Sequence, residues 1–122
     1  MLQKYVDLTE KIIGASLKIH TYLGNGFLEV VYQRCLAIEL QKLGLHYERE
    51  QTMHIYYDGQ HVGSHRIDFL VENKVIVELK ATPFLEPAHS AQLLRYLKTM
   101  NREVGLLINF GERSLLTKRI VN

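Results

Sequence analysis

The sequence contains a single cysteine, Cys35, among its 122 residues. One thiol permits neither an internal disulfide nor an all-cysteine metal cluster. The longest apolar stretches are only a few residues, which is too short for a membrane-spanning helix. The first residues, Met1-Leu2-Gln3-Lys4-Tyr5, lack the apolar core of a signal peptide. From these absences we expect a cytoplasmic protein with no membrane partner.

Proline is also scarce, and the net charge is small. The two prolines, Pro83 and Pro87, lie close together, and no repeat, low-complexity tract or linker interrupts the chain. A content of 47% hydrophobic and 23% charged residues is ordinary for a globular protein, so we expect one domain over residues 1–122. The net charge of +2 is compatible with a polyanionic partner but does not indicate one.

Three segments have the apolar spacing or the end signals of helices. Apolar residues recur at helical spacing from Leu8 to Leu23, and Gly24-Asn25-Gly26 interrupts the pattern. A second helical pattern runs from about Phe27 to Leu43. Glu86-Pro87 places proline at a first helical position and predicts a helix over about 87–101.

The remaining segments are typical of strands. A rather polar strand is predicted over about 46–57, and Asp58-Gly59 after it is a strong hairpin signal. Further strands are predicted over 61–71, 75–81, 103–110 and, as a short final strand, within 114–122. The order of helices and strands indicates an α/β (α+β) protein with a mixed central sheet flanked by helices.

Charged residues stand inside two of these apolar strands. Asp68 lies in the run Arg66–Val71, and Glu78-Leu79-Lys80 ends the run that begins at Val75. Residues two apart on a strand point to the same face, about 6.5 to 7 Å apart. Carboxylates and an ammonium group in covered strands are costly unless they are paired, metal-bound or open to a cleft. We therefore expect a metal site beside Lys80, which points to phosphodiester chemistry.

The register of the two strands decides whether the acids meet. A three-residue turn at Glu72-Asn73-Lys74 pairs Val71 with Val75 and brings Asp68 opposite Glu78. A turn of even length would put the two acids on opposite faces of the sheet. A shared metal ion therefore requires the odd register. The alternative is an ordinary strand salt bridge between Glu78 and Lys80.

The pattern of Asp68 followed by Glu78-x-Lys80 resembles the core motif of the PD-(D/E)XK nuclease superfamily, although Ile67 stands where the motif has proline. The segment Gly26-Phe27-Leu28-Glu29-Val30-Val31-Tyr32 matches the motif of the GxxExxY proteins, and the resemblance extends to Leu107-Ile108-Asn109-Phe110. The resemblance implies a restriction-endonuclease-like αβββαβ core and metal-dependent cleavage of nucleic acid.

Residue chemistry and the resemblance together assign roles at this site. Asp68 and Glu78 offer the oxygen ligands that Mg²⁺ (or Mn²⁺) takes in phosphate chemistry. Such an ion polarises the phosphoryl oxygen and offsets charge on the leaving oxygen. Lys80 is placed to orient or deprotonate the attacking water. The motif makes Glu29 a further metal ligand, whereas the plain alternative is a first-turn glutamate favoured by the helix dipole.

Several other residues are auxiliary candidates. Tyr32, one turn after Glu29, would either orient it or simply pack. His89, Gln92 and Tyr96 share one face of the last long helix. The pair Gln92 and Tyr96 resembles an extra motif of RecB-type exonucleases, which implies contact with the metal site. A structural hydrogen bond is the equal alternative for Gln92, and for His89 and His20 a satisfied polar side chain is favoured.

Residues that could contact nucleic acid are less specific. Arg66 lies on the Asp68 face of a regular strand and would reach a phosphate or a carboxylate. Tyr56 and Tyr57 would stack on bases, but packing within the strand is favoured, and Cys35 is expected to be buried and inert. Exposed positive charges usually only solvate a surface, and this is the default for the remaining basic residues: Lys74, Arg95, Lys98, Arg102, Arg113, Lys118 and Arg119.

The function that fits best is a Mg²⁺-dependent nuclease acting on DNA, with Asp68, Glu78, Lys80, Glu29 and Gln92 as the catalytic set. A chain close to the bare core would need a homodimer or a protein partner to select its substrate. Two alternatives remain open. One is a catalytically silent nucleic-acid-binding or assembly module on the same fold, and the other is a hydrolase of a different phosphodiester, such as a nucleotide signal.

Overall fold

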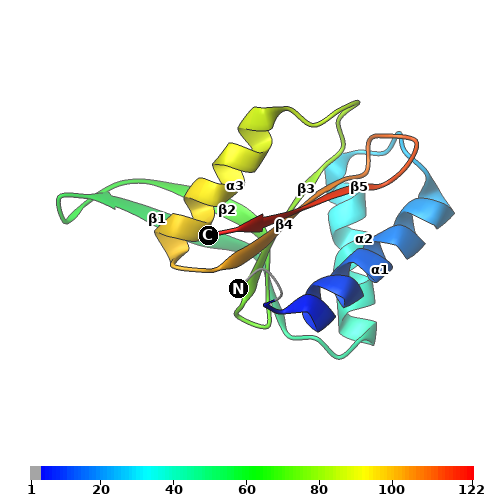
Figure 1. The fold of residues 1–122 in the computed structure, drawn as a ribbon, viewed down its shortest axis with the longest axis horizontal. Coiled ribbons are helices and arrows are strands. Elements are labelled where there is room, and N and C mark those ends of the chain that lie inside the picture. Colours follow the sequence, from blue (N-terminus) through cyan, green and yellow to red (C-terminus); the bar gives the residue numbers. More distant parts are fainter. Residues whose placement is uncertain (1–3) are drawn as a thin grey trace.

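The structure is a computed structural model that describes residues 4–122. Met1-Leu2-Gln3, which begin the segment without the apolar core of a signal peptide, lie outside the described residues. Its helices and strands follow the predicted order (Figure 1). They are α1 (Val6–Leu23), α2 (Glu29–Lys42), β1 (Tyr47–Tyr57), β2 (Gln60–Val71), β3 (Val75–Lys80), α3 (Pro87–Met100), β4 (Val104–Asn109) and β5 (Leu116–Val121).

The five strands form one mixed sheet in the order β1-β2-β3-β4-β5. The pairs β1/β2, β2/β3 and β4/β5 are antiparallel, and β3/β4 is parallel. The parallel pair needs a crossover, which α3 supplies. Helices α1 and α2 lie on one face of the sheet and α3 on the other (Figure 1). This arrangement confirms the predicted restriction-endonuclease-like fold class.

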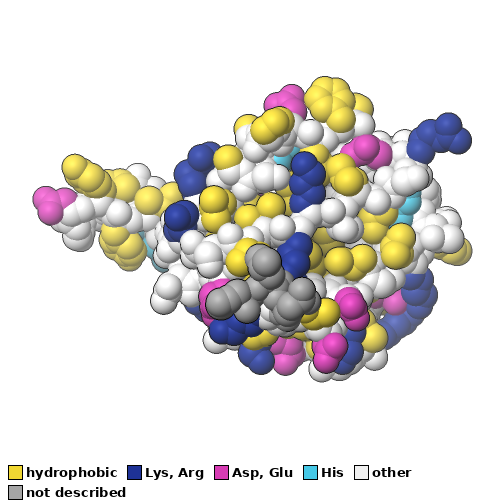
Figure 2. Space-filling model, in the orientation of Figure 1, with side chains coloured by type: hydrophobic (Ala, Val, Ile, Leu, Met, Phe, Trp, Pro, Cys, Tyr) yellow, Lys and Arg dark blue, Asp and Glu magenta, His cyan; other side chains and the backbone are white. Residues whose placement is uncertain are grey.

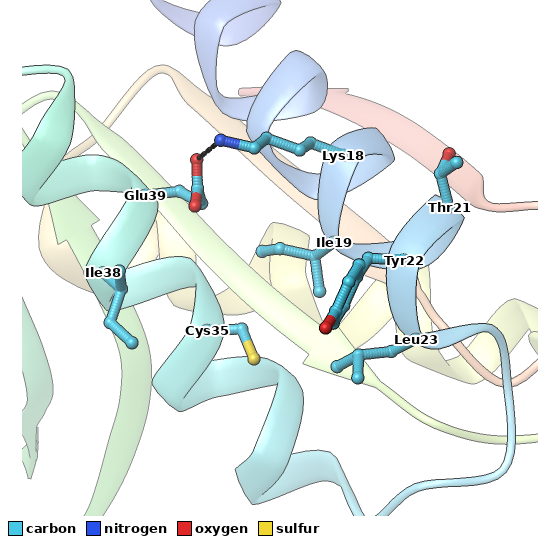
Figure 3. Close-up of a pocket in the computed structure, with 8 residues that line it drawn as sticks. All are labelled: Lys18, Ile19, Thr21, Tyr22, Leu23, Cys35, Ile38 and Glu39. Carbon is cyan, nitrogen blue, oxygen red and sulfur yellow. Dashed lines mark hydrogen bonds and ion pairs between the residues drawn. The ribbon is translucent and has the colours of Figure 1, made fainter.

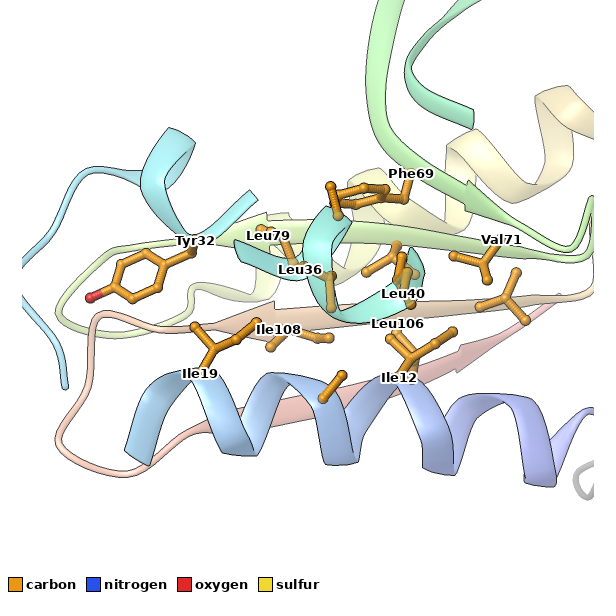
Figure 4. Packing of buried hydrophobic residues seen from close by; sticks show 14 of the residues in the cluster. Ile12, Ile19, Tyr32, Leu36, Leu40, Phe69, Val71, Leu79, Leu106 and Ile108 are labelled. Carbon is orange, nitrogen blue, oxygen red and sulfur yellow. The ribbon is translucent and has the colours of Figure 1, made fainter. Parts of the chain in front are cut away.

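Two hydrophobic clusters, one on each face, hold these layers together. The larger cluster includes Ile12 of α1 and Leu36 of α2 (Figure 4). Val77 of β3 belongs to the same cluster, and all three residues are fully buried. The smaller one joins Leu93 of α3 and Ile76 of β3. Neighbouring residues of β3 thus serve opposite faces, as strand alternation requires. This double coverage explains why the strand reads as a continuous apolar run.

Helix α2 begins later than the predicted Phe27. Gly26 has φ 111°, and Leu28 is extended, so Glu29 is the first helical residue. The hydroxyl group of Tyr32 donates to the carbonyl oxygen of Gly24 (2.6 Å) and accepts from the N–H of Phe27 (3.3 Å). The turn between the helices is therefore held by Tyr32, which also stacks on Phe110 with ring centroids 4.5 Å apart.

The loops after β3 and β4 are joined by a buried polar residue that sequence reasoning had not selected. The amide oxygen of Asn109 accepts from the N–H groups of Thr82 and Gly111, both at 3.1 Å. Its amide nitrogen donates to the carbonyl oxygen of Thr82 and to Glu112 Oε2, both at 2.9 Å. Four hydrogen bonds thus fix the loop ends beside Lys80, the residue opposite Asn109 in the parallel ladder.

Two expectations about packing are wrong. Tyr56 and Tyr57 do not pack within the sheet, because the β1–β2 hairpin extends beyond its neighbours and leaves them 63% and 76% exposed. Cys35 is only partly buried, because it faces a cavity between α1 and α2. In residues 4–122, none of the helices is both long enough and apolar enough to cross a bilayer.

Candidate metal centre

The strands β2 and β3 separate at the two acids. They pair from Val71 opposite Val75 to Phe69 opposite Val77, which confirms the predicted odd register. Beyond this point, hydrogen bonds from backbone N–H groups to the carboxylates replace the backbone ladder. The N–H of Asp68 donates to Glu78 Oε2, and the N–H of Leu79 donates to Asp68 Oδ2, both at 2.7 Å. Each acid is therefore held by the strand that carries the other.

Asp68 is fixed from the other side by α2. The Gln33 side chain, which is 6% exposed, donates from Nε2 to Asp68 Oδ1 at 2.9 Å. Gln33 Oε1 in turn accepts from Arg49 Nε at 2.9 Å. Because Gln33 donates to one oxygen atom of Asp68 and the Leu79 N–H donates to the other, both oxygen atoms are held in place. Sequence reasoning missed Gln33 and Arg49, and the only available signal was that Gln33 follows the motif residue Tyr32.

Glu78 faces α3 and a histidine that was also missed. His65 Nε2 lies 3.6 Å from Glu78 Oε1, and its ring stacks on Tyr96 with centroids 4.4 Å apart. The buried Nε2 atom has no hydrogen-bond partner among the described residues. Regular alternation from Asp68 puts His65 on the opposite face. The strand breaks that alternation, since Ile67 and Phe69 belong to different clusters.

The electrostatics show that negative charge is crowded at this point. Burial raises the pKa of Glu78 to about 8, with repulsion from Asp68 as the next cause. Burial also raises the pKa of Asp68, against the hydrogen bonds from Leu79 and Gln33. Desolvation first, and then Asp68, raise the pKa of Glu29, and Lys80 opposes the rise. A cation among these oxygens would relieve the crowding.

The residues present fit a divalent ion with oxygen ligands. The Glu78 carboxylate accepts the N–H of Asp68, and the Asp68 carboxylate accepts the N–H of Leu79. Glu29 is within electrostatic range of both acids. Within residues 4–122, no group of three or more His, Cys, Asp or Glu side chains is arranged to hold a metal ion. Mg²⁺ commonly takes only one or two protein carboxylates and fills its other positions with water and phosphate.

Lys80 is the lysine that the sequence pattern placed beside this centre. It is partly buried at the end of β3 and acts electrostatically on Asp68, Glu78 and Glu29. In the part of the chain that the structure describes, it forms no ion pair within 4.0 Å. The alternative of an ordinary Glu78–Lys80 strand salt bridge is therefore wrong.

The auxiliary candidates divide into near and distant ones. Tyr96 lies beside His65. Burial raises the pKa of Tyr96, and the charge of Glu78 is the second cause. Gln92 is partly buried one turn earlier on α3, and no side-chain hydrogen bond of it is found within residues 4–122. His89 instead serves the start of α3, since its Nδ1 accepts from the N–H of Glu86 (3.1 Å). His20 contacts the carbonyl oxygen of Glu112 (2.9 Å) and has a structural role.

Arg66 and Tyr32 do not reach the two acids. The Arg66 guanidinium lies 3.5 Å from Glu50 Oε2 at an exposed position, so it meets a carboxylate outside the centre. The break in alternation at Asp68 turns it outward, and His65 takes the inner position. Tyr32 packs and holds the turn before Glu29, which decides between the two predicted roles in favour of packing.

On the face seen in Figure 2, Lys and Arg side chains are scattered and do not gather in one patch. Among the basic residues considered for nucleic-acid contact, Arg102 donates to Asn73 Oδ1 (2.8 Å) and Arg119 donates to Thr9 Oγ1 (2.9 Å). This distribution supports the default expectation of solvated charges.

A cavity of about 640 Å³ lies elsewhere, between α1 and α2 (Figure 3). Ile19, Leu23, Cys35 and Ile38 give it mostly apolar walls, and the Lys18–Glu39 ion pair (3.0 Å) closes one side. No residue of the candidate centre lines it. The cavity is therefore separate from the acids that the sequence pattern selected.

Comparisons with known proteins agree with this fold. A family model described as the PD-(D/E)XK nuclease superfamily matches residues 6–120. The solved structure "Crystal structure of SSO0001" is similar in fold, with a TM-score of 0.62 at 19% sequence identity. The similarity covers 99% of this chain and 61% of the other, so the chain spans about three fifths of the length of that protein. No curated protein matches this sequence.

Proposed function

The chain belongs to the PD-(D/E)XK nuclease superfamily, and from this we propose that it is a Mg²⁺-dependent nuclease that hydrolyses phosphodiester bonds in DNA. The observation that carries the proposal is the reciprocal contact of Asp68 and Glu78. Each carboxylate accepts an N–H from the opposite strand at 2.7 Å, and the pKa of Glu78 is raised to about 8. Crowded carboxylates of this kind are typical of functional sites rather than of stable cores.

In this proposal Asp68 and Glu78 hold the ion, and Glu29 is the third ligand. When bound, Mg²⁺ (or Mn²⁺) supplies Lewis-acid stabilisation of the phosphate charge. Gln33 and the N–H of Leu79 orient the two oxygens of Asp68. Because Lys80 is near all three acids and forms no ion pair with them, its ammonium group is free to orient the attacking water and to offset charge on the phosphate.

Residues on α3 complete the proposed site. Tyr96 supports His65 by stacking, which keeps the imidazole beside Glu78. Gln92, partly buried on the same helix and without a protein partner within residues 4–122, is proposed to bind the substrate. His89 and Arg66 have contacts elsewhere and are left out of the proposed chemistry.

The finer assignments are also proposals. The segment Gly26–Tyr32 supports membership of the GxxExxY group, since it forms one structural unit in which Tyr32 holds the turn and Glu29 begins α2. A homodimer or a protein partner that helps to select the substrate is a further part of the proposal. The cytoplasm is the proposed location.

A cleavage assay tests the proposal. The protein is incubated with supercoiled, linear and single-stranded DNA and with RNA, in Mg²⁺ or Mn²⁺, beside Lys80→Ala and Glu78→Gln. We expect DNA cleavage that needs the metal and falls by about 100-fold or more in both variants, since each removes a charge that acts on the transition state. Lys11→Ala, an exposed lysine of α1, is the matched control and should cleave normally.

Two results would contradict the proposal. If the wild-type protein cleaves none of the substrates, the nuclease assignment fails, and binding without cleavage supports the silent nucleic-acid-binding module instead. If Lys80→Ala cleaves as fast as the wild-type protein, the site is wrongly assigned.

A further inference from the structure

The β1–β2 hairpin extends from the body of the protein as a two-stranded arm, defined here as residues 52–66 (Figure 1). Over this length β1 and β2 pair only with each other, because the β2–β3 ladder is confined to Phe69–Val71 and Val75–Val77. The base of the arm is anchored, since Met53 is 3% exposed and Ile55 packs against the α3 cluster. The arm is therefore a supported projection rather than a loose loop.

The tip of the arm presents apolar and aromatic surface to solvent. Tyr56, Tyr57 and Val62 are 63%, 76% and 60% exposed. Two aromatic side chains at the end of a projecting hairpin contribute nothing to the core of the monomer. Exposed apolar surface of this kind is typical of a binding site.

The rings near the tip are already ordered. His54 Nδ1 and His61 Nε2 are 3.2 Å apart across the two strands. The Tyr56 ring meets the His61 ring edge-on, with centroids 5.5 Å apart. The Tyr56 ring therefore needs little further ordering to meet a partner, which lowers the entropic cost of binding.

The charge of the tip narrows the choice of partner. Residues 55–65 contain one acid, Asp58, and neither lysine nor arginine. The tip in Figure 2 likewise shows hydrophobic side chains and an acidic one. Binding along the backbone of an intact duplex depends on neutralising phosphates, which this tip cannot do. The faces of unpaired bases instead stack on aromatic rings, and this stacking contact is made by the ring itself and not by a charged group.

The arm is continuous with the proposed catalytic centre. Strand β2 carries His65 and Asp68 at its inner end and begins at Gln60 beside the tip. Eight residues of strand separate Asp68 from Gln60, which corresponds to about 26 Å. A nucleic acid bound at the centre would thus reach the tip roughly seven or eight nucleotides away.

We propose that Tyr56 and Tyr57 bind unpaired bases and direct the nuclease to nucleic acids with a single-stranded or branched region roughly seven or eight nucleotides from the cleavage site. The inference rests on the proposed function for the reaction itself. It concerns the substrate that this site accepts, and the arm supplies the recognition element that a bare nuclease core lacks.

The test is binding in EDTA, where no cleavage occurs. Fluorescence anisotropy compares three labelled DNA probes: a single strand, a fork with unpaired arms and a blunt duplex. We expect the wild-type protein to prefer the first two, and Tyr56→Ala/Tyr57→Ala to lose about tenfold or more of its affinity for them with little change on the duplex. Tyr56→Phe/Tyr57→Phe, which keeps the rings, should bind within about twofold of the wild-type protein.

The matched control is Tyr22→Ala, because Tyr22 is 88% exposed on α1, outside the arm. An equal loss in this variant, no loss in the double alanine variant, or a preference for the blunt duplex would overturn the proposal. Sedimentation of each protein gives a further contrary outcome. If the double alanine variant turns a dimer into a monomer, the tip is an interface with a second copy rather than a base-binding surface.

The two proposals fail in different ways. Probe binding that depends on the tyrosines, together with no cleavage of any substrate, contradicts the nuclease and keeps the arm as a binding element. If cleavage of the forked DNA depends on Lys80 but not on the two tyrosines, the proposed role of the arm is contradicted and the nuclease assignment is supported.

Discussion

At the residue scale, the unusual property of this protein is that the buried Glu78 and the partly buried Asp68 are held by backbone N–H groups rather than by cations. The contacts at 2.7 Å position Asp68 and Glu78 but supply less than a full counter-charge. Burial therefore dominates, and the pKa of Glu78 rises to about 8. The arrangement is costly to the stability of the folded protein, which agrees with the proposal that these groups serve chemistry.

This cost gives a pH-dependent stability. Because the pKa of Glu78 is raised in the folded state from 4.5, folding binds a proton between roughly pH 4.5 and pH 8. The stabilisation is present at the acidic end and is lost as the pH rises through about 8. In EDTA, we expect the unfolding free energy of the wild-type protein to fall across this range by on the order of a few kcal/mol more than that of Glu78→Gln.

Chemical denaturation at a series of pH values provides the measurement. Glu10→Gln, at an exposed position of α1, is the control and should follow the wild-type curve. Parallel curves for the wild-type protein and Glu78→Gln would show that Glu78 is not protonated in this way.

Gln33 provides a second prediction at this scale. Both Gln33→Leu and Gln33→Glu lose the donor to Asp68 Oδ1, so the carboxylate is no longer fixed. In the cleavage assay we expect the Mg²⁺ concentration for half-maximal rate to rise, or the rate to fall, by about 10- to 100-fold. Gln41→Leu, exposed on the same helix, should behave as the wild-type protein. An unchanged metal dependence in both Gln33 variants would mean that Gln33 only fills space.

At the element scale, the segment from Gly24 to Tyr32 shows how a short motif combines structural and chemical residues. Gly26 adopts φ 111°, a conformation that favours glycine, and Tyr32 bonds back to Gly24. Together they set the point at which α2 begins and so the position of Glu29. The tyrosine of the motif thus acts on the backbone, and the glutamate is its candidate for chemistry.

Removing the Tyr32 hydroxyl group tests this division. Tyr32→Phe keeps the stacked ring but leaves the Gly24 carbonyl oxygen without its 2.6 Å donor. We expect the unfolding free energy to fall by about 1–3 kcal/mol, measured by urea denaturation. Tyr22→Phe alters an 88% exposed side chain and should change stability little. Equal stability of the two variants would contradict the structural role of Tyr32.

The elements themselves could be predicted because periodicity and turn residues are local. The order of three helices and five strands, the Asp58-Gly59 turn and the odd register at Glu72-Asn73-Lys74 all agree with the structure. The beginning of α2 was misplaced by two residues, since a tertiary hydrogen bond from Tyr32 sets it. The exposure of Tyr56 and Tyr57 was missed because the length of the neighbouring strand β3 decides it.

At the scale of the whole molecule, the sheet with helices on both faces is one layered unit. Strand β3 lies at its centre and contributes to both hydrophobic clusters. The chain ends are tied in as well, because Arg119 of β5 donates to Thr9 of α1. These contacts support the proposal that residues 1–122 form one domain.

One domain predicts one cooperative unfolding transition. Far-ultraviolet circular dichroism, which follows the helices and strands, and tyrosine fluorescence should give the same midpoint in urea. The chain has no tryptophan, so its seven tyrosines report directly on packing on both faces. Two separated transitions, or midpoints that differ between the probes, would contradict a single domain.

The sequence by itself determined the order of the elements and which strands are covered on both faces. It also selected Asp68, Glu78 and Lys80 as the candidate site residues. These are local properties, since they depend on periodicity, on turn length and on charges in apolar runs. Only the tertiary structure decided that Gln33 and His65 join the acids while Arg66 does not. Those contacts depend on how α2 and α3 pack on the sheet and on where β2 parts from β3, and neither is written in any one segment of the chain.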